Sequence, residues 1–268
     1  MSQEVVSLLA DEWAVLAALG DDLADSDWDL PTELPGWSVK DVFSHMIGTE
    51  RMLLGDPAPA APSNFGAHVK NPIGEFNEAW IAERADRSGA EVLNEFKQVT
   101  TARLAALQAM SDEEFEAEGF TPEGPGPYRK FMEIRLFDCW EHEQDIRRAV
   151  GKEGHLTGPI AERCIDKCID SAGYVVGKKA QAPQGSTVVF NIVGPIERLV
   201  GIAVRERAER IYDIPENPDV TLTLDTATYN ALACGRMSGD EALAIDANII
   251  SGNQTIGQQV LNNLAFTI

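Results

Sequence analysis

The period of the hydrophobic pattern changes once along this chain, near residue 180, and that change limits the possible folds more than any other feature. Before it, apolar residues such as Val5, Leu9 and Trp13 recur at helical spacing. After it, residues 187–193 and 220–224 alternate with a period of two, which is typical of strands. Helices followed by a smaller mixed unit are therefore expected.

A chain of 268 residues is long for one domain. We expect an up-down four-helix bundle over residues 1–180 and a small α+β domain over residues 181–268. The hydrophobic share of 44% is enough for real cores without disulfides. The four cysteines form no CxxC pair, and Cys164 and Cys168 fall in an apolar helical stripe, so buried free thiols are expected.

Local signals place the helix ends in the first domain. Ser38 is a good N-cap with Asp41 three residues later, Ser88 and Glu91 form a capping box, and Gly151 can end a helix. The expected helices after the opening segment are 39–54, 73–86, 89–109, 128–150 and 159–177.

The net charge of −21 argues against nucleic acid and against an anionic membrane surface as partners. No stretch approaches the roughly 18 apolar residues of a membrane span, and the first residues lack a secretory signal. A cytoplasmic location is therefore expected.

The helix expected at 128–150 mixes ionisable and apolar residues on one face. That face holds Phe131, Ile134, Arg135, Asp138, His142, Asp145 and Ala149. The opposite face is expected to be exposed and holds Lys130, Glu133, Glu143, Gln144, Arg147 and Arg148. Charged groups on an inward face need a compensating partner.

Asp138 and His142 are four residues apart, so their side chains lie side by side on a helix and can bind one ion. His45, on the flank of an apolar stripe, is the best candidate for a third ligand. Two histidines and one carboxylate leave open coordination positions, as in a catalytic metal site. A buried His–Asp hydrogen bond without metal is the alternative.

Two neighbouring residues have open roles. Arg135 is a candidate for binding an anionic substrate group or for pairing with Asp138 or Glu133. Asp145 is a candidate acceptor that fixes the tautomer of His142, or simply a charge near the helix end. His68 and His155 are expected to face solvent, and Trp37 to anchor the helix that carries His45.

Two stretches resemble a known family. LPGWSVKDVFSHMIG and RLFDCWEHEQDIRRAVG are similar to motifs of the mycothiol-dependent maleylpyruvate isomerase family, a branch of the DinB-like metal-binding four-helix bundles. The resemblance covers about residues 1–180. It implies a divalent metal, generally Zn²⁺, at His45, Asp138 and His142, with mycothiol as cosubstrate. The family usually has Glu where this chain has Asp138.

The stretch from Val220 to the end resembles the sterol-carrier-protein type 2 fold, which implies an apolar pocket. In the isomerase an arginine of the second domain helps to bind the substrate. Arg198, Arg205 and Arg236 are the candidates in this chain. A homodimer is also compatible with the resemblance.

The resemblance implies an enzyme that activates mycothiol as a zinc-bound thiolate for attack on an electrophilic small molecule. S-transfer that yields a conjugate is our main expectation, and cis–trans isomerisation of maleylpyruvate is the alternative. Two hypotheses come from other classes: a non-catalytic protein that binds a lipid or small molecule, and a hydrolase that uses zinc-bound water.

Overall fold

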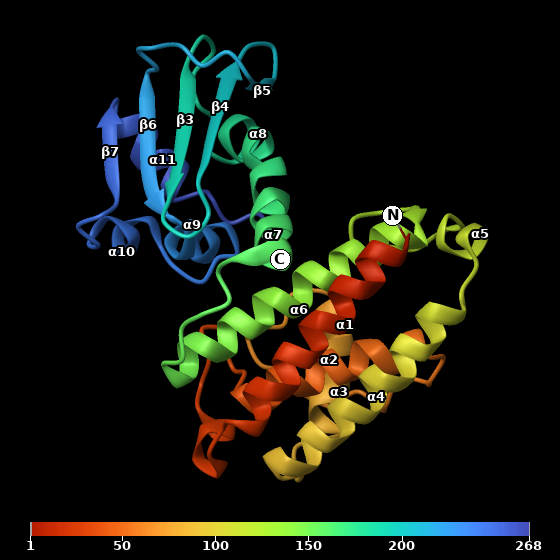
Figure 1. Ribbon diagram of the computed structural model, residues 1–268. Helices are drawn as coiled ribbons and strands as arrows, with labels where there is room; N and C mark the ends of the chain where they lie inside the picture. The colour runs from red at the N-terminus through yellow and green to blue at the C-terminus, as the bar shows by residue number, and fades with distance from the viewer. Residues whose placement is uncertain (1, 268) are drawn as a thin grey trace. The chain divides into compact units, whose positions relative to one another are not determined.

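The protein is described by a computed structural model over residues 2–267, which form two compact units (Figure 1). The units divide between Gly154 and His155, so the expected boundary near residue 180 lies inside the second unit. The helix α7 (Gly158–Asp170) causes this difference. Its buried side packs against α9 (Thr226–Ala233), and it therefore belongs with the sheet.

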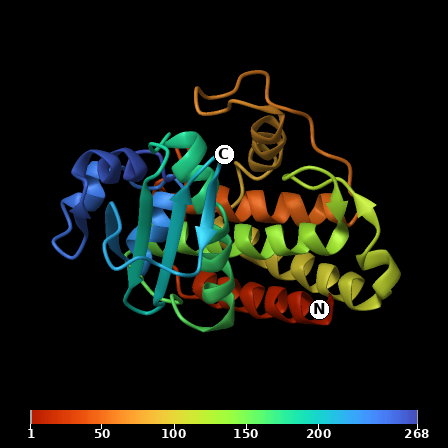
Figure 2. The ribbon, with the colours of Figure 1, turned by 90° about the horizontal axis from the view of Figure 1, so that it is seen from above.

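Four long helices build the first unit. They are α1 (Ser2–Asp21), α2 (Val39–Leu53), α4 (Gly89–Ala109) and α6 (Tyr128–Val150). Both α1 and α2 contact α4 and α6, so the four form a bundle (Figure 2). The helices expected at 39–54, 89–109 and 128–150 are thereby confirmed.

Shorter elements connect these helices. They are η1 (Asp25–Asp29), α3 (Pro72–Ala82), α5 (Asp112–Phe115), β1 (Glu118–Gly119) and β2 (Gly126–Pro127). The helix α3 ends four residues before the expected 86, because the chain turns after Ala82. β1 and β2 pair antiparallel.

The capping signals form as expected from the sequence. Ser38 accepts from the backbone of Asp41, and the Asp41 carboxylate accepts from Ser38 in return. Ser88 and Glu91 form the same reciprocal box at the start of α4. Gly151 ends α6 with a φ of 64°, in the left-handed region that favours glycine. These caps set where α2 and α4 begin and where α6 ends.

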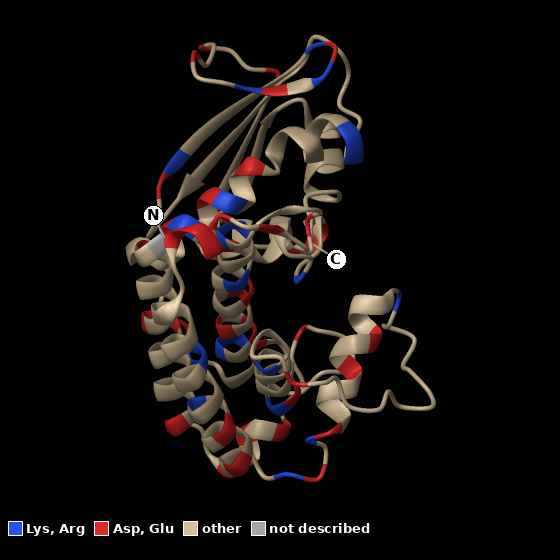
Figure 3. Ribbon diagram, turned by 90° about the vertical axis from the view of Figure 1, so that its right-hand side faces the viewer, with Lys and Arg blue, Asp and Glu red and all other residues tan. Residues whose placement is uncertain are grey.

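One prediction about α6 is wrong. Glu143 and Gln144 were expected on the solvent side, but their exposed fractions are 0% and 4%. The reason is that α6 contacts α1 as well as α2, so it is covered on two sides. Both acidic and basic residues lie along α2, α4 and α6 (Figure 3), and several of these charges are buried as pairs.

The second unit contains a five-stranded sheet in the order β5-β4-β3-β6-β7. Its strands are β3 (Thr187–Val193), β4 (Arg198–Val204), β5 (Ala208–Ile211), β6 (Val220–Asp225) and β7 (Ile249–Gly252). β3 and β6 are parallel and all other pairs are antiparallel. The strands expected at 187–193 and 220–224 are confirmed, whereas β5 and β7 are too short to show a clear alternation in the sequence.

The remaining helices of this unit follow α7 or accompany the sheet. They are α8 (Ala172–Tyr174), the π-helical η2 (Val175–Lys179), α9, α10 (Gly239–Leu243) and α11 (Gln254–Leu261). The helix expected at 159–177 is therefore interrupted at Ser171. All four cysteines are buried and free, as expected. Within residues 2–267, no helix combines the length and the apolar character that crossing a membrane requires.

Candidate metal centre

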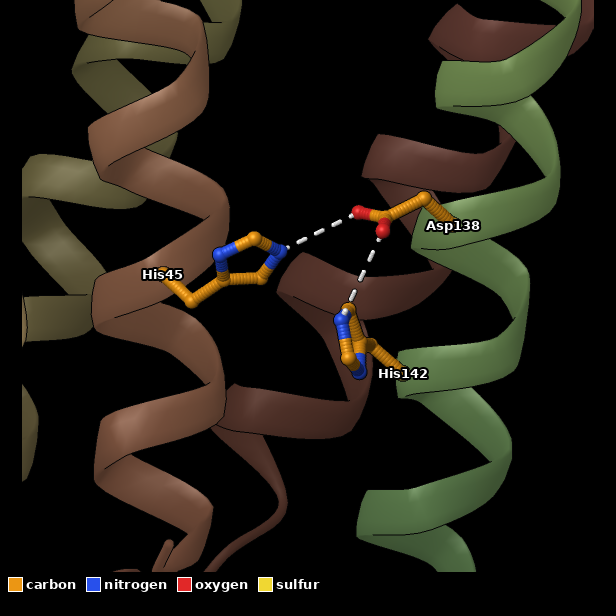
Figure 4. Close-up of side chains that lie close together, drawn as sticks. All are labelled: His45, Asp138 and His142. Atoms are coloured by element: carbon orange, nitrogen blue, oxygen red, sulfur yellow. Dashed lines mark hydrogen bonds and ion pairs between the residues drawn. The ribbon is translucent and has the colours of Figure 1, made fainter. Parts of the chain in front are cut away.

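Three candidate ligands from two helices meet in the bundle (Figure 4). His45 extends from α2, and Asp138 and His142 extend from α6. Nε2 of His45 lies 3.3 Å from Oδ2 of Asp138, and Nε2 of His142 lies 3.7 Å from Oδ1 of the same carboxylate. One ligand atom from each residue lies within 4.8 Å of the other two.

The local sequence of α6 places two of these three ligands, Asp138 and His142. One helical turn separates Asp138 from His142, so their side chains leave α6 on the same face. His45 reaches them because α2 begins at Ser38 and packs against α6.

The donor set fits a divalent ion. Two ligand atoms held about 2.1 Å from a tetrahedral ion lie roughly 3.4 Å apart, close to the spacings seen here. Imidazole nitrogens and one carboxylate suit Zn²⁺ and also other transition metals. Three protein ligands leave at least one coordination position for another molecule.

Asp145 fixes the tautomer of His142. Its Oδ2 lies 3.0 Å from Nδ1 of His142, and its Oδ1 accepts from Nη2 of Arg148 at 2.7 Å. Because an ionised carboxylate can only accept a hydrogen bond, Nδ1 of His142 carries the proton. The lone pair of His142 Nε2 is then directed toward Asp138. Asp145 also lies near the C-terminal end of α6, so it is both an acceptor for His142 and a charge close to the helix end.

His45 is neutral at neutral pH. Burial lowers the pKa of His45, although the negative charge of Asp138 acts in the opposite direction. A neutral imidazole is the form that binds a metal. Its Nδ1 is buried and has no hydrogen-bond partner among the described residues.

Asp138 is ionised well below neutral pH. Burial acts to raise its pKa, but the positive charge of Arg135 and the two imidazoles hold that pKa well below its usual range. Nη1 of Arg135 donates to Oδ2 of Asp138. The other carboxylate oxygen, Oδ1, faces His142.

A buried chain of charges supports Arg135. Its Nε donates to Glu50 at 2.9 Å, and Nε of Arg103 donates to the same carboxylate at 3.1 Å. Glu50 is 1% exposed and Arg135 3%. Arg135 therefore pairs within the protein, with both Glu50 and Asp138. Glu50 was not among the residues expected at the site. It lies four residues after Met46, on the apolar stripe of α2, and this helical spacing could have identified it.

The centre opens to solvent at its carboxylate. The side chain of Asp138 is 31% exposed, whereas those of His45 and His142 are each 8% exposed. The half-buried indole of Trp37 lies beside both imidazoles, with ring centroids 5.3 Å from His45 and 6.2 Å from His142. Sequence reasoning gave Trp37 only the role of an anchor.

Three other candidate residues, His68, Arg198 and Arg236, have partners within their own units. His68 was expected to face solvent, but it is half-buried, and its Nε2 lies 2.9 Å from Oε1 of Glu78. In the second unit, Arg198 pairs with Asp166 of α7, and Nη1 of Arg236 donates to the carbonyl of Cys234. Each of these contacts is internal to its own unit.

Comparisons with known proteins agree with this architecture. The family model described as the mycothiol maleylpyruvate isomerase N-terminal domain matches residues 9–147. An uncharacterized protein of Mycobacterium tuberculosis, matched in strains H37Rv and CDC 1551, is 31% identical over 141 residues, which are 51% of this chain and 52% of the relative. The chain therefore matches these curated relatives over about half of their length.

A crystal structure of the mycothiol-dependent maleylpyruvate isomerase has the same fold. It superimposes with a TM-score of 0.59 at 16% identity and covers 94% of this chain and 93% of its own. Because that coverage is nearly complete, the shared fold includes both units. Sterol Carrier Protein 2 from Yarrowia lipolytica matches 40% of this chain and 93% of its own, with a TM-score of 0.29 and 13% identity.

Proposed function

Because the chain belongs to the family of the mycothiol maleylpyruvate isomerase N-terminal domain, we propose that it is a metal-dependent enzyme that uses mycothiol to attack an electrophilic small molecule. The observation that carries this proposal is the convergence of His45, Asp138 and His142 at one solvent-accessible carboxylate. These three side chains would hold the ion. A divalent ion with an open coordination position binds a thiol sulfur and lowers the thiol pKa, so that the thiolate is present at neutral pH.

The protein's own residues prepare the centre in two ways. Asp145 holds the proton of His142 on Nδ1 and so leaves Nε2 as a ligand. Arg135 engages Oδ2 of Asp138 and keeps the carboxylate ionised, while Glu50 balances the charge of Arg135. The site thus has its ligands in the protonation states that metal binding requires.

The thiolate would then add to a carbon–carbon double bond conjugated to a carbonyl group. In the adduct this bond is single and can rotate. Elimination of the thiolate from the rotated adduct restores the double bond in the trans form and returns the thiol unchanged. If the adduct instead takes up a proton and leaves, the product is an S-conjugate and the thiol is consumed.

Isomerisation is the better supported of these two outcomes. The matching family model and the structural neighbour both carry the isomerase description. The expected S-transfer has no support from a residue of this chain. This chain has Asp138 where the family usually has Glu, and an assay is therefore needed to distinguish isomerisation from S-transfer.

One assay distinguishes the outcomes. Zinc-loaded protein is mixed with maleylpyruvate and mycothiol, and both the trans product and free thiol are followed. Trans product at constant thiol supports isomerisation, and an equimolar loss of thiol supports S-transfer. Loss of maleylpyruvate without thiol and without trans product would indicate a hydrolase, and no turnover of either kind with this substrate would count against the isomerase.

Metal content tests the ligands directly. The purified protein is expected to bind about one Zn²⁺ per chain, as three converging ligands imply. His45→Ala, Asp138→Ala and His142→Ala should each lose this ion, whereas Glu83→Ala, which changes an exposed carboxylate of the same unit, should keep it. Full metal content in the first three variants would refute the assignment.

A further inference from the structure

The two histidines of the centre differ in their outer support. Nδ1 of His142 faces Asp145 at 3.0 Å, whereas Nδ1 of His45 has no hydrogen-bond partner among the described residues. A hydrogen bond at this nitrogen usually orients a metal-ligating imidazole. Apart from the contact of its Nε2 with Asp138, the ring of His45 must therefore be oriented by packing.

The indole of Trp37 supplies that packing. Its ring lies 5.3 Å from the His45 ring between centroids, at an interplanar angle of 37°. The imidazole of His45 also meets His142 edge-on, with ring centroids 4.8 Å apart. Rotation of the His45 ring would move it into one of these neighbours.

Trp37 is itself fixed by hydrogen bonds from both its main chain and its side chain. Its backbone carbonyl accepts from the backbone and the hydroxyl of Thr32, and its N–H donates to the carbonyl of Leu34. Its indole Nε1 donates to Oε1 of Glu78, on α3, at 2.9 Å. The main-chain bonds hold the turn, and Glu78 determines which way the indole faces.

His68 shares the same carboxylate oxygen. Its Nε2 lies 2.9 Å from Oε1 of Glu78. It also packs closely on the turn before Trp37, because a Cβ atom added at Gly36 would lie 2.7 Å from Cε1 of His68. Glu78 is therefore held between the indole and the end of the segment that connects α2 to α3.

We propose that Trp37 and Glu78 are positioning residues for His45, and that they replace the outer hydrogen bond that this ligand lacks. Glu78 orients the indole, and the indole orients the imidazole toward the ion. The predicted effect on Zn²⁺ affinity rests on the proposed function, whereas the orientation of the Trp37 indole can be measured without metal.

The first experiment measures the indole alone. Trp37 is half-buried, and the other four tryptophans are buried: Trp13, Trp28, Trp80 and Trp140. Acrylamide quenching therefore reports mainly Trp37, and Trp37→Phe gives the background. Glu78→Ala should increase the quenching, and Glu78→Gln should restore the wild-type value because its amide oxygen still accepts from the indole.

The second experiment measures Zn²⁺ affinity by competition with a chromophoric chelator. Trp37→Ala and Glu78→Ala should each weaken binding about tenfold, the lower limit for loss of an outer partner of a ligand. Trp37→Phe, which keeps a ring, and Glu78→Gln should lie nearer to wild type. Asp56→Asn is the matched control, because it breaks the 2.9 Å pair with Arg51 at the other end of the same connecting segment.

The outcomes separate the two proposals. Unchanged zinc affinity in folded Trp37→Ala and Glu78→Ala, with wild-type protein that binds zinc, overturns the inference alone. Unchanged quenching in Glu78→Ala overturns the role of Glu78 whatever the metal result. Wild-type protein that binds no zinc overturns the proposed function and the metal part of the inference together.

Discussion

The Nδ1 atom of His142 lies 3.0 Å from Oδ2 of Asp145, a carboxylate with no exposed surface. The two are three positions apart along α6, so the same helix that places His142 also supplies the acceptor that fixes its tautomer. Arg148 holds the other oxygen of Asp145. The carboxylate therefore has a fixed direction before any ligand arrives.

Asp145→Asn should weaken zinc binding about 10-fold to 100-fold, the usual effect of removing such a partner. An amide holds the imidazole less firmly and accepts a weaker hydrogen bond from it. Chelator competition measures the change. Glu33→Gln, which alters an exposed partner of Arg148, is the control and should bind zinc as wild type does. Equal affinity in both variants would show that Asp145 does not act on the ligand.

Glu50→Ala should destabilise the protein by about 3–5 kcal/mol, because it removes the counter-charge of buried Arg103 and leaves buried Arg135 with Asp138 alone. Arg103 and Arg135 are 2% and 3% exposed, and both donate to Glu50. Urea unfolding measures the loss. Glu116→Ala breaks an exposed pair with Arg129 and should cost no more than about 1 kcal/mol. A similar loss of unfolding free energy in the two variants would show that burial does not make the Glu50 pairs more important for stability.

Glu12→Gln should stabilise the protein at pH 8 by on the order of 1 kcal/mol, with a smaller gain near pH 4.5. Burial first, and then the negative charge of Glu143, raises the pKa of Glu12 well above its usual range. The folded state then holds a proton that the unfolded chain has lost. Stability therefore falls as the pH rises from the usual pKa of glutamate through the folded-state pKa, and a neutral amide removes this loss.

Thermal unfolding at the two pH values tests this prediction. Glu4→Gln changes an exposed carboxylate on the same helix, α1, and serves as the control. Its stability relative to wild type should not depend on pH. A Glu12→Gln variant that is less stable than wild type at pH 8 would mean that the carboxylate is ionised and stabilising there.

Gly48→Ala should destabilise the bundle by about 1–3 kcal/mol through overpacking. A Cβ atom at Gly48 would lie 2.3 Å from Cγ of Trp80, so α2 and α3 would have to separate. The expected fall in Tm is about 2–4 °C for each kcal/mol. Gly119→Ala, where an added Cβ meets no atom within 4 Å, should leave Tm nearly unchanged. An unchanged Tm in Gly48→Ala would show that the contact between α2 and α3 can relax.

Much of the helical unit could be predicted because its signals are local. Ser38 and Gly151 mark helix ends through hydrogen bonds and backbone angles that involve only a few neighbouring residues. The burial of Glu143 could not be predicted in this way. A helical wheel shows which residues share a face, but it does not tell how many neighbours cover the helix.

The helices, the change to strands and the side-by-side placement of Asp138 and His142 could be predicted from local patterns, since each depends on spacing along one element. The contacts of His45 with Asp138, of Arg135 with Glu50 and of Trp37 with His45 required the folded structure. These contacts join segments far apart in the chain. They depend on how α2 packs against α6, which is set by the packing of many side chains at once rather than by any local pattern.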